Sequence, residues 1–399
     1  MEKNIYSGLT RVLALVALVF SSISTVFGGS VAAWGAGTKI TSPADGLYNY
    51  GQSIPPAGTT NAAEIAAGGL QSLALLAGGK LQGWGDDGFH ETNYFSLNST
   101  NFIAVTCGVY FSAALRSDGT VAASGDDFFG EIGVPNDLTN VVAIAGGSFH
   151  CLALKADGTV VAWGGQGAED FGQGTVPAGI SNVVAIAAGG FHNLVLRADG
   201  TLVAWGSNTS GQTNVPAGVT NVIAISAGVE HNVVLKRDGT VQTWGGDEYG
   251  QLDRPAGLSN VVAVSCGGWH TLALKNNGTV VAWGAGAGSN ANVDFGQSTV
   301  PAGLTNVVQV AGGWKHSLAL VGGPSLVTPM VPSLPVRSTN GFSVTLPSTR
   351  NGRVYQLEFK NSLTDSAWQS LPLQAGTGGN LSFVDPAIAT QRYYRVVQW

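Results

Sequence analysis

Five of the six histidines occupy the same position of a repeated sequence pattern. These five are His150, His192, His231, His270 and His316. A ring of imidazoles could bind a metal ion, because neutral histidine is a common ligand of zinc. Gln71 and Phe111 take this position in two other copies, however, and equivalent residues of a rotationally repeated fold lie far apart unless they reach its axis. The pattern therefore favours a structural role, in which the rings bond to neighbouring backbone groups.

Acidic residues form a second recurrent group, in a loop of unequal length that follows each Trp-Gly or Ser-Gly pair. The acidic members are Asp86, Asp87, Asp126, Asp127, Glu169, Asp170, Asp247, Glu248 and Asp294, and the aromatic residues beside them are Phe128, Phe129, Phe171 and Tyr249. Loops at the same point of each repeat should share one face, so these residues predict an acidic face with aromatic anchors for a partner. A basic protein surface, calcium or a sugar would suit such a face. The simpler alternative is that acidic turns only keep the protein soluble.

No known catalytic arrangement stands out from the repeat. We find no nucleophile elbow, metal-ligand spacing or phosphate-binding loop, and paired acids such as Asp126 and Asp127 are common in turns. Cys107, Cys151 and Cys266 occupy small-residue positions, which indicates packing and not a disulfide or a metal site. The sequence predicts a protein that is not an enzyme and that uses no cofactor and no metal.

The elements that must position these residues follow from a repeat of about forty residues. In the copy from Gly189 to Gly206, His192 precedes Trp205 by 13 positions, and the other full copies keep this step. Between the two, alternating apolar runs flank Asp199-Gly200, which predicts a β-hairpin with a tight primed turn. Another apolar run precedes each copy, and a weaker segment with Gly-Gln and Val-Pro follows it. Three or four short strands per repeat are typical of a propeller blade.

The two ends of the repeat region complement each other. The last copy stops at residues 321–323, where its hairpin turn should fall, and the missing half is present at residues 29–35. A blade joined from both ends closes a ring and protects its edge strands. The sequence therefore predicts an all-β fold with a seven-bladed β-propeller over residues 29–323, closed by N- and C-terminal half-blades.

The repeat resembles the regulator of chromosome condensation family of seven-bladed propellers. The motifs G-x-x-H, L-A-L, D-G-T-V, W-G and G-Q carry the resemblance, which covers about residues 29–323. The short period and the V-P-A-G links are most similar to the secreted bacterial branch, which includes a propeller that inhibits β-lactamases by covering their active sites. The resemblance implies binding of a protein partner. The family's best-known nuclear member performs nucleotide exchange on a small GTPase, which the acidic charge and the predicted export signal oppose here.

The remaining segments predict export and a second domain. Residues 1–28 have the charged start, apolar core and small residues of a cleaved signal peptide, with an uncleaved N-terminal anchor as the alternative. Residues 324–337 form a Pro-rich linker. Residues 338–399 resemble small β-sandwich modules of secreted bacterial proteins, and strands are expected at 341–346, 354–360, 381–384 and 393–397, with Trp368 in the core.

The net charge of −6 and the absence of a Lys/Arg cluster oppose nucleic-acid binding. We therefore expect an exported, monomeric, non-catalytic propeller, without a membrane span after signal cleavage, which acts outside the cell or at its surface. It would bind a protein partner through its loop face, and inhibition of an extracellular enzyme is the most specific form of this hypothesis. The alternatives are a carbohydrate- or calcium-binding surface adhesin, a guanine-nucleotide exchange factor, and a propeller lyase or hydrolase.

Overall fold

The computed structural model describes residues 29–37, 50–92, 101–286, 293–322, 336–338, 341–347, 349, 353–361, 365, 367–377, 379–386 and 392–398. Within these residues the fold is all-β, and its one helical turn is the 3-10 helix η2 (Gly167–Glu169). None of the described segments is a helix that could span a membrane. The predicted signal peptide and most of the predicted linker lie outside the described residues.

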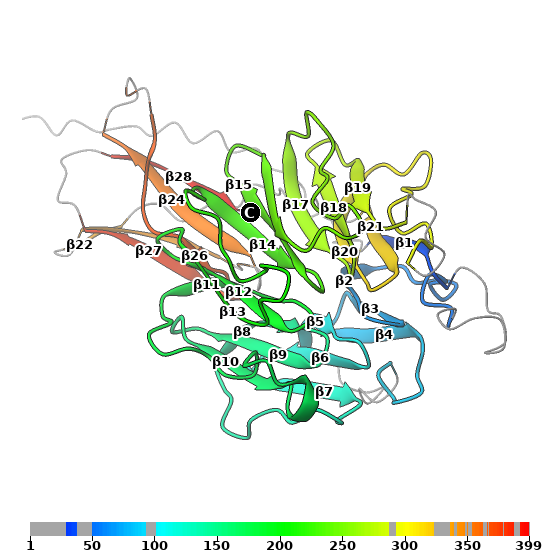
Figure 1. Cartoon of the computed structure of the whole chain (residues 1–399). Helices are drawn as coiled ribbons and strands as arrows, with labels where there is room; N and C mark the ends of the chain where they lie inside the picture. Colours follow the sequence, from blue (N-terminus) through cyan, green and yellow to red (C-terminus); the bar gives the residue numbers. More distant parts are fainter. Residues whose placement is uncertain are drawn as a thin grey trace, which may run out of the picture.

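Seven three-stranded antiparallel sheets, counted over the described residues, surround one axis (Figure 1). The inner strands are β2 (Ala62–Ala67), β5 (Phe102–Cys107), β8 (Val141–Gly146), β11 (Val183–Ala188), β14 (Val222–Ala227), β17 (Val261–Cys266) and β20 (Val307–Gly312). The middle strands are β3 (Gln71–Leu76), β6 (Phe111–Arg116), β9 (His150–Lys155), β12 (His192–Arg197), β15 (His231–Lys236), β18 (His270–Lys275) and β21 (His316–Val321). The outer strands are β4 (Lys80–Gly85), β7 (Val121–Gly125), β10 (Val160–Gly164), β13 (Leu202–Gly206), β16 (Val241–Gly245), β19 (Val280–Gly284) and β1 (Ser30–Gly35). Each inner strand contacts those of both neighbouring sheets, and β20 contacts β2, so the predicted seven-bladed propeller is confirmed.

The blade that joins the two ends of the repeat region is also confirmed. Strand β1 pairs with β21, which separates it from β20 (Figure 1). Trp34 pairs with Ser317 in the same register in which Trp163 pairs with Cys151 in an uninterrupted blade. An N-terminal strand therefore supplies the outer edge of the last blade and ties the ring shut.

The Asp-Gly hairpins are present, but the predicted primed turn is wrong. A primed turn of that type needs positive φ at both central residues, whereas only the glycine has it: Gly158 has φ 79°, and Asp157 is not in the positive region. The Asp157 carboxylate instead accepts bonds from the Thr159 amide (3.0 Å) and hydroxyl (2.6 Å). The chain thus makes an unprimed turn that is followed by a glycine in the left-handed conformation. The aspartate carboxylate stabilises the end of this turn through its bonds to Thr159.

The weaker segment with Gly-Gln and Val-Pro forms turns and not a fourth strand in any blade that the structure describes. Each tryptophan of an outer strand instead reaches back to this segment of the preceding blade. The indole N–H of Trp163 donates to the Glu131 carbonyl (2.9 Å), and that of Trp283 donates to the Gln251 carbonyl (2.9 Å). The Trp-Gly signature therefore fixes the loop of one blade to the body of the next.

A closed circle of backbone hydrogen bonds links all seven blades around the axis. Each bond runs from an amide just before one middle strand to a carbonyl of the next blade. The bonds, 2.9–3.2 Å long, are Gly69 to Gly108, Val109 to Ser148, Ser148 to Gly189, Gly190 to Gly228, Val229 to Gly268, Gly268 to Gly313 and Trp314 to Gly68. The acceptor is glycine in six of these bonds and serine in the seventh, because a larger side chain at the acceptor would keep the backbones apart.

The C-terminal residues form two further small sheets. One contains β22 (Val336–Ser338), β23 (Gly341–Leu346) and β27 (Leu381–Asp385), and the other contains β24 (Val354–Lys360), β25 (Gln369–Ser370), β26 (Gln374–Ala375) and β28 (Tyr393–Gln398). They share one hydrophobic cluster, in which Tyr355 is fully buried and Phe383 nearly so. The four expected strands are confirmed. Trp368 is not in this core, however, because its ring lies beneath the Arg395 guanidinium, 4.6 Å from the ring centroid.

The C-terminal sheets pack on the hairpin-turn side of the propeller. The Leu373 amide donates to the Ala198 carbonyl (3.1 Å), and Val354 joins a hydrophobic cluster with Val184 of β11. Arg237 of the propeller pairs with the buried Glu358 and also bonds to Gln356. The opposite face, where the middle strands begin, is not involved in these contacts.

We expect Arg237→Ala to loosen this contact while the propeller stays folded. The substitution removes the side-chain bonds of a half-buried arginine to Glu358, Gln356 and Ser370, which corresponds to about 1–3 kcal/mol. Limited proteolysis should cut between the two parts faster in this variant. Arg116→Ala removes an arginine at the same end of β6, where the side chain bonds only to Thr120, and should leave the cleavage rate unchanged. Equal rates for all three proteins would contradict the prediction.

Candidate binding face

The loops that carry the predicted partner-binding residues all leave outer strands at the same face, which we call the loop face. Asp86 and Asp87 follow β4, the segment Asp126–Phe129 follows β7, and Glu169, Asp170 and Phe171 lie at η2 after β10. Asp247, Glu248 and Tyr249 follow β16, and Asp294 lies in the loop after β19. The loops are brought together as expected, although the binding role of these residues stays a prediction.

Aromatic rings from three consecutive blades form one continuous cluster on this face. Phe129 contacts Phe128 and Phe149 at centroid distances of 5.0 Å each. Phe191 continues the cluster, 5.7 Å from Phe149 and 5.2 Å from Phe171. In these blades the ring before the Gly-Gln pair, or before Gly130-Glu131, therefore packs on the ring before the histidine of the next blade. These contacts place several large apolar groups side by side at the surface.

A second aromatic cluster lies across the ring. Tyr249 contacts Trp269 (6.2 Å), which stacks on Trp314 (5.6 Å). The Lys315 ammonium lies 4.8 Å from the centroid of Phe295, and desolvation lowers the pKa of this buried lysine to about 8. Between the clusters, the contact is polar, because Ser210 donates to the Glu230 carboxylate (3.1 Å).

The first cluster is the more exposed one. Phe128 has 80% of its surface exposed, and Phe171 has 46%. Phe89 contacts Tyr110 of the next blade, and 47% of its surface is exposed. Large apolar side chains so exposed, beside acidic loops, are the pattern of an interaction site.

Several predicted acidic residues hold the conformation of their own loops. The Asp87 carboxylate accepts bonds from the Thr92 amide (3.0 Å) and hydroxyl (2.6 Å). The carboxylates of five others accept one or two backbone amides each: Asp86, Asp127, Asp170, Asp247 and Asp294. Among the described residues, no group of three His, Cys, Asp or Glu side chains is placed to hold a metal ion.

The histidines have the predicted structural role, but their partners are side chains and not backbone groups. The Nε2 atom of His150 bonds to the Asn193 side chain of the next blade (2.8 Å), and the other four rings repeat this contact. In the first blade the Gln71 amide donates instead to the Gly108 and Phe111 carbonyls. Burial lowers the pKa of His150 to about 4 and that of His231 to about 3, so both rings are neutral.

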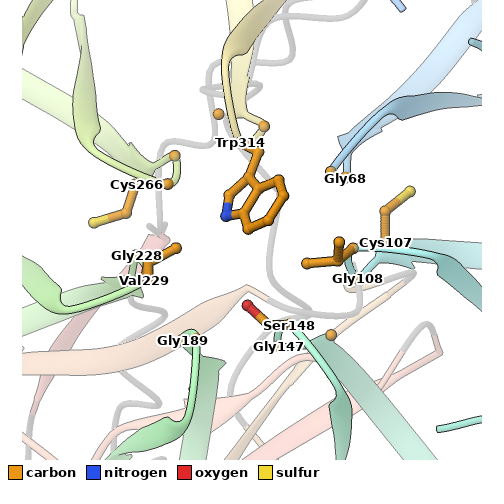
Figure 2. Close-up of a pocket in the computed structure, with 18 of the residues that line it drawn as sticks. Gly68, Cys107, Gly108, Gly147, Ser148, Gly189, Gly228, Val229, Cys266 and Trp314 are labelled. Carbon is orange, nitrogen blue, oxygen red and sulfur yellow. The ribbon is translucent and has the colours of Figure 1, made fainter. Parts of the chain in front are cut away.

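A narrow well of about 100 Å³ opens at the axis of the propeller. Figure 2 shows its wall of glycines, with the Trp314 indole projecting into it and Ser148 facing it. Cys107 and Cys266 line the well, but their thiols point away from it (Figure 2), and burial raises their pKa values to about 12. A nucleophile in its reactive thiolate form is therefore not found at this position.

The charges of the propeller are divided between its two faces. In the described part of the propeller, seven cations lie at the hairpin turns, at the end away from the loop face: Lys80, Arg116, Lys155, Arg197, Lys236, Arg237 and Lys275. Arg254 follows the loop of the fifth blade, and Lys315 is the one cation directly before a middle strand. Since the acidic loops lie at the other end, the loop face carries the negative charge.

Sequence reasoning missed part of this face. It did not select Phe149, Phe191, Trp269 and Trp314, which complete the two aromatic clusters. The signal was present, because aromatic residues recur directly before the histidine position in four copies: Tyr110, Phe149, Phe191 and Trp269.

Five segments of the chain match the sequence profile of the regulator of chromosome condensation (RCC1) repeat: 102–131, 141–173, 183–212, 222–251 and 261–292. The chain carries RCC1 repeats. Each matched segment begins at the first residue of an inner strand. The first four end at the Gly-Gln position or its Gly-Glu equivalent, and the fifth ends before Gly296-Gln297. The structure adds two sheets of the same form outside the matched segments, β2-β3-β4 and β1-β21-β20.

Solved structures confirm the RCC1-like propeller fold. Prp20p from Saccharomyces cerevisiae, described with its binding to Gsp1p and histones, is 20% identical with a TM-score of 0.57 over 76% of this chain and 93% of its own. Human WBSCR16 is 21% identical with a TM-score of 0.57 over 75% and 100%. The ectodomain of the Physcomitrella patens receptor kinase CR4 is 21% identical with a TM-score of 0.52 over 69% and 77%. No curated protein sequence matches the chain.

Proposed function

We propose that this protein is an exported, non-catalytic RCC1-repeat propeller that binds a basic surface of a protein partner through its loop face. The observation that carries the proposal is the distribution of charge: acidic loops and exposed rings share one face, and seven of the nine cations of the described propeller lie at the other. Charge complementarity steers encounter and sets orientation, while buried aromatic anchors supply affinity. Inhibition of an extracellular enzyme, by covering its active site, is the specific form that we propose.

Two further observations support this assignment. The C-terminal sheets contact the hairpin-turn side, so they leave the loop face open to a partner. The loops are held by their own carboxylates, as in Asp247 with Leu252, so little order would have to be gained on binding. An RCC1-like fold in the ectodomain of a plant receptor kinase is compatible with an extracellular setting.

We expect Phe128→Ala to weaken partner binding about thirtyfold, the effect of losing an interface anchor worth about 2 kcal/mol. The measurement is capture of binding proteins from the medium and envelope of the producing cells, followed by titration of each captured protein. Phe128 is 80% exposed, so its truncation should leave the melting temperature unchanged.

The matched control removes acidic residues from the opposite face. Asp118, Asp157, Asp199 and Asp238 lie in the hairpin turns, and their joint replacement by alanine alters the net charge more than a double change of Asp126 and Asp127. The loop-face variant, Asp126→Ala with Asp127→Ala, should lose the partner, and the hairpin variant should retain it. Loss of the partner in the hairpin variant alone would move the binding site to the opposite face. Retention of polysaccharide instead of protein would favour the surface adhesin.

A further inference from the structure

One loop position is occupied by glutamine in five blades and by glutamate in two. The glutamines are Gln52, Gln173, Gln212, Gln251 and Gln297. The side-chain oxygen of each accepts the amide two residues earlier, at 2.7–2.9 Å. In three of these blades the side-chain amide also donates back into the same loop: Gln173 to the Glu169 carbonyl, Gln297 to the Val293 carbonyl (2.5 Å) and Gln212 to the Ser207 hydroxyl (3.4 Å). In these three the glutamine closes the loop with one accepted and one donated bond.

Glu91 and Glu131 make only the first of these two bonds. Oε2 of Glu91 accepts the Phe89 amide (2.9 Å), and Oε2 of Glu131 accepts the Phe129 amide (2.7 Å). The other oxygen, Oε1, is buried in both residues and has no hydrogen-bond partner. An ionised carboxylate has no proton to donate, so only the protonated acid can reproduce what the glutamine does.

The charges around both carboxyl groups disfavour their ionised form. Burial is the main reason that the pKa of each is raised, and aspartates of the same loop add to it: Asp86 and Asp87 for Glu91, and Asp126 and Asp127 for Glu131. The other titratable neighbours are the thiols of Cys107 and Cys151, whose own pKa values are raised as well. No cation is among the groups that act on either carboxyl group.

We propose that Glu91 and Glu131 are proton-dependent latches that close two loops of the loop face. With a proton on Oε1 each side chain carries one acceptor and one donor, as its glutamine counterparts do, and the loop is closed. Without it, the buried charge is relieved when the loop opens to water. The open loop binds protons less tightly than the closed one, so raising the pH favours opening by up to about tenfold per pH unit between the two pKa values.

A bound cation is the rival explanation, and the geometry disfavours it. Asp86 and Asp87 already accept backbone or hydroxyl protons from their own loop, and the described residues contain no group of ligands placed for a metal. A proton needs no further ligands. The two loops carry Phe89, Phe128 and Phe129, so the latches would also make partner binding at the loop face depend on pH. This consequence rests on the proposed function.

Hydrogen exchange of four amides tests the latches without any partner. The Phe89 and Phe129 amides are held by glutamates, and the Phe171 and Tyr249 amides are held by glutamines in the equivalent loops. We expect the protection of the first pair, relative to the second, to rise as the pH is lowered from neutral toward the usual pKa of an exposed glutamate. The rise should be up to about tenfold per pH unit below the raised pKa. The ratio removes any change in global stability, which affects all four amides.

Glu91→Gln should make the relative protection of the Phe89 amide independent of pH and leave that of the Phe129 amide unchanged. Glu131→Gln should have the converse effect. A ratio that does not change with pH in the unmodified protein, or one that still changes in the Gln variants, would overturn the proposal. A ratio that responds to calcium or EDTA instead of pH would also overturn it in favour of a cation. If the ratio behaves as expected but Phe128→Ala binds every captured protein normally, the latches stand and the proposed function fails.

Discussion

Acidification below about pH 6.5 should unfold this protein steeply, with the uptake of up to five protons by the buried histidines. An unfolded histidine binds a proton near pH 6.5, whereas burial lowers the folded pKa to about 4 for His150 and His192 and to about 3 for His231, His270 and His316. The unfolded state therefore binds more protons between these limits, and stability falls as the pH drops. With all five in this window the slope is about 7 kcal/mol per pH unit, large beside a typical stability of about 5–15 kcal/mol.

The measurement is denaturant unfolding at a series of pH values. His231→Gln should reduce the slope by about 1.4 kcal/mol per pH unit, because one titrating group is lost. Glutamine is the matched replacement, since Gln71 holds this position in the first blade and also bonds to the next blade, through backbone carbonyls. His90→Gln, in an exposed loop, is the control and should not change the slope. Protonation of the buried Glu91 and Glu131 favours the folded state and so opposes this slope. Two such groups cannot cancel five histidines, so a flat profile would mean that the five rings do not stay neutral in the folded protein.

Gly228→Ala should destabilise the protein by more than about 3 kcal/mol, the range of severe overpacking. A Cβ at this position would lie 2.3 Å from Cε1 of the His231 ring and 2.6 Å from the Gly267 carbonyl oxygen of the next blade. Neither can move away freely, because the ring is bonded to Thr271 (3.0 Å) and the carbonyl belongs to the closely packed wall around the axis.

Gly88→Ala is the matched control for this experiment. A Cβ at Gly88 would meet nothing closer than the Asp86 carboxylate at 3.5 Å, and its backbone is outside the positive φ region. We expect its melting temperature to stay within a few degrees of the unmodified protein. A Gly228→Ala protein as stable as Gly88→Ala would show that the contact at the axis tolerates a methyl group.

The G-x-x-H signature illustrates how far the sequence leads. Its spacing and its recurrence predicted a hairpin repeat, and Gly147 and His150 recur because the ring lies directly on the glycine. The partner of the ring was predicted wrongly as backbone, because Asn193 lies in the next blade, 43 residues further along the chain. Strand pairing within a blade is local and leaves a periodic trace, whereas contacts between blades depend on the rotation from one blade to the next.

The candidate site shows the same division. The acidic loops and Phe128, Phe129, Phe171 and Tyr249 were predicted to share one face, because loops at one point of a repeat must do so. Phe149 and Phe191 were missed, since their role follows from contact with rings of neighbouring blades. Glu91 and Glu131 were also missed. Glu in place of Gln is a small change in a sequence, and only the structure shows that both side chains are buried, where a charged group is unfavourable.

The sequence by itself determined the all-β class, the three strands of each blade, the split blade and the acidic character of the loops. These depend on apolar periodicity, turn residues and composition, which act within about forty residues. Only the tertiary structure decided the circle of backbone bonds at the axis, the side-chain partners of the histidines and the face on which the C-terminal sheets pack. It also decided that two glutamates are buried without a partner for Oε1. Each of these depends on which surfaces meet when the ring closes, and desolvation at those surfaces is a property of the folded protein alone.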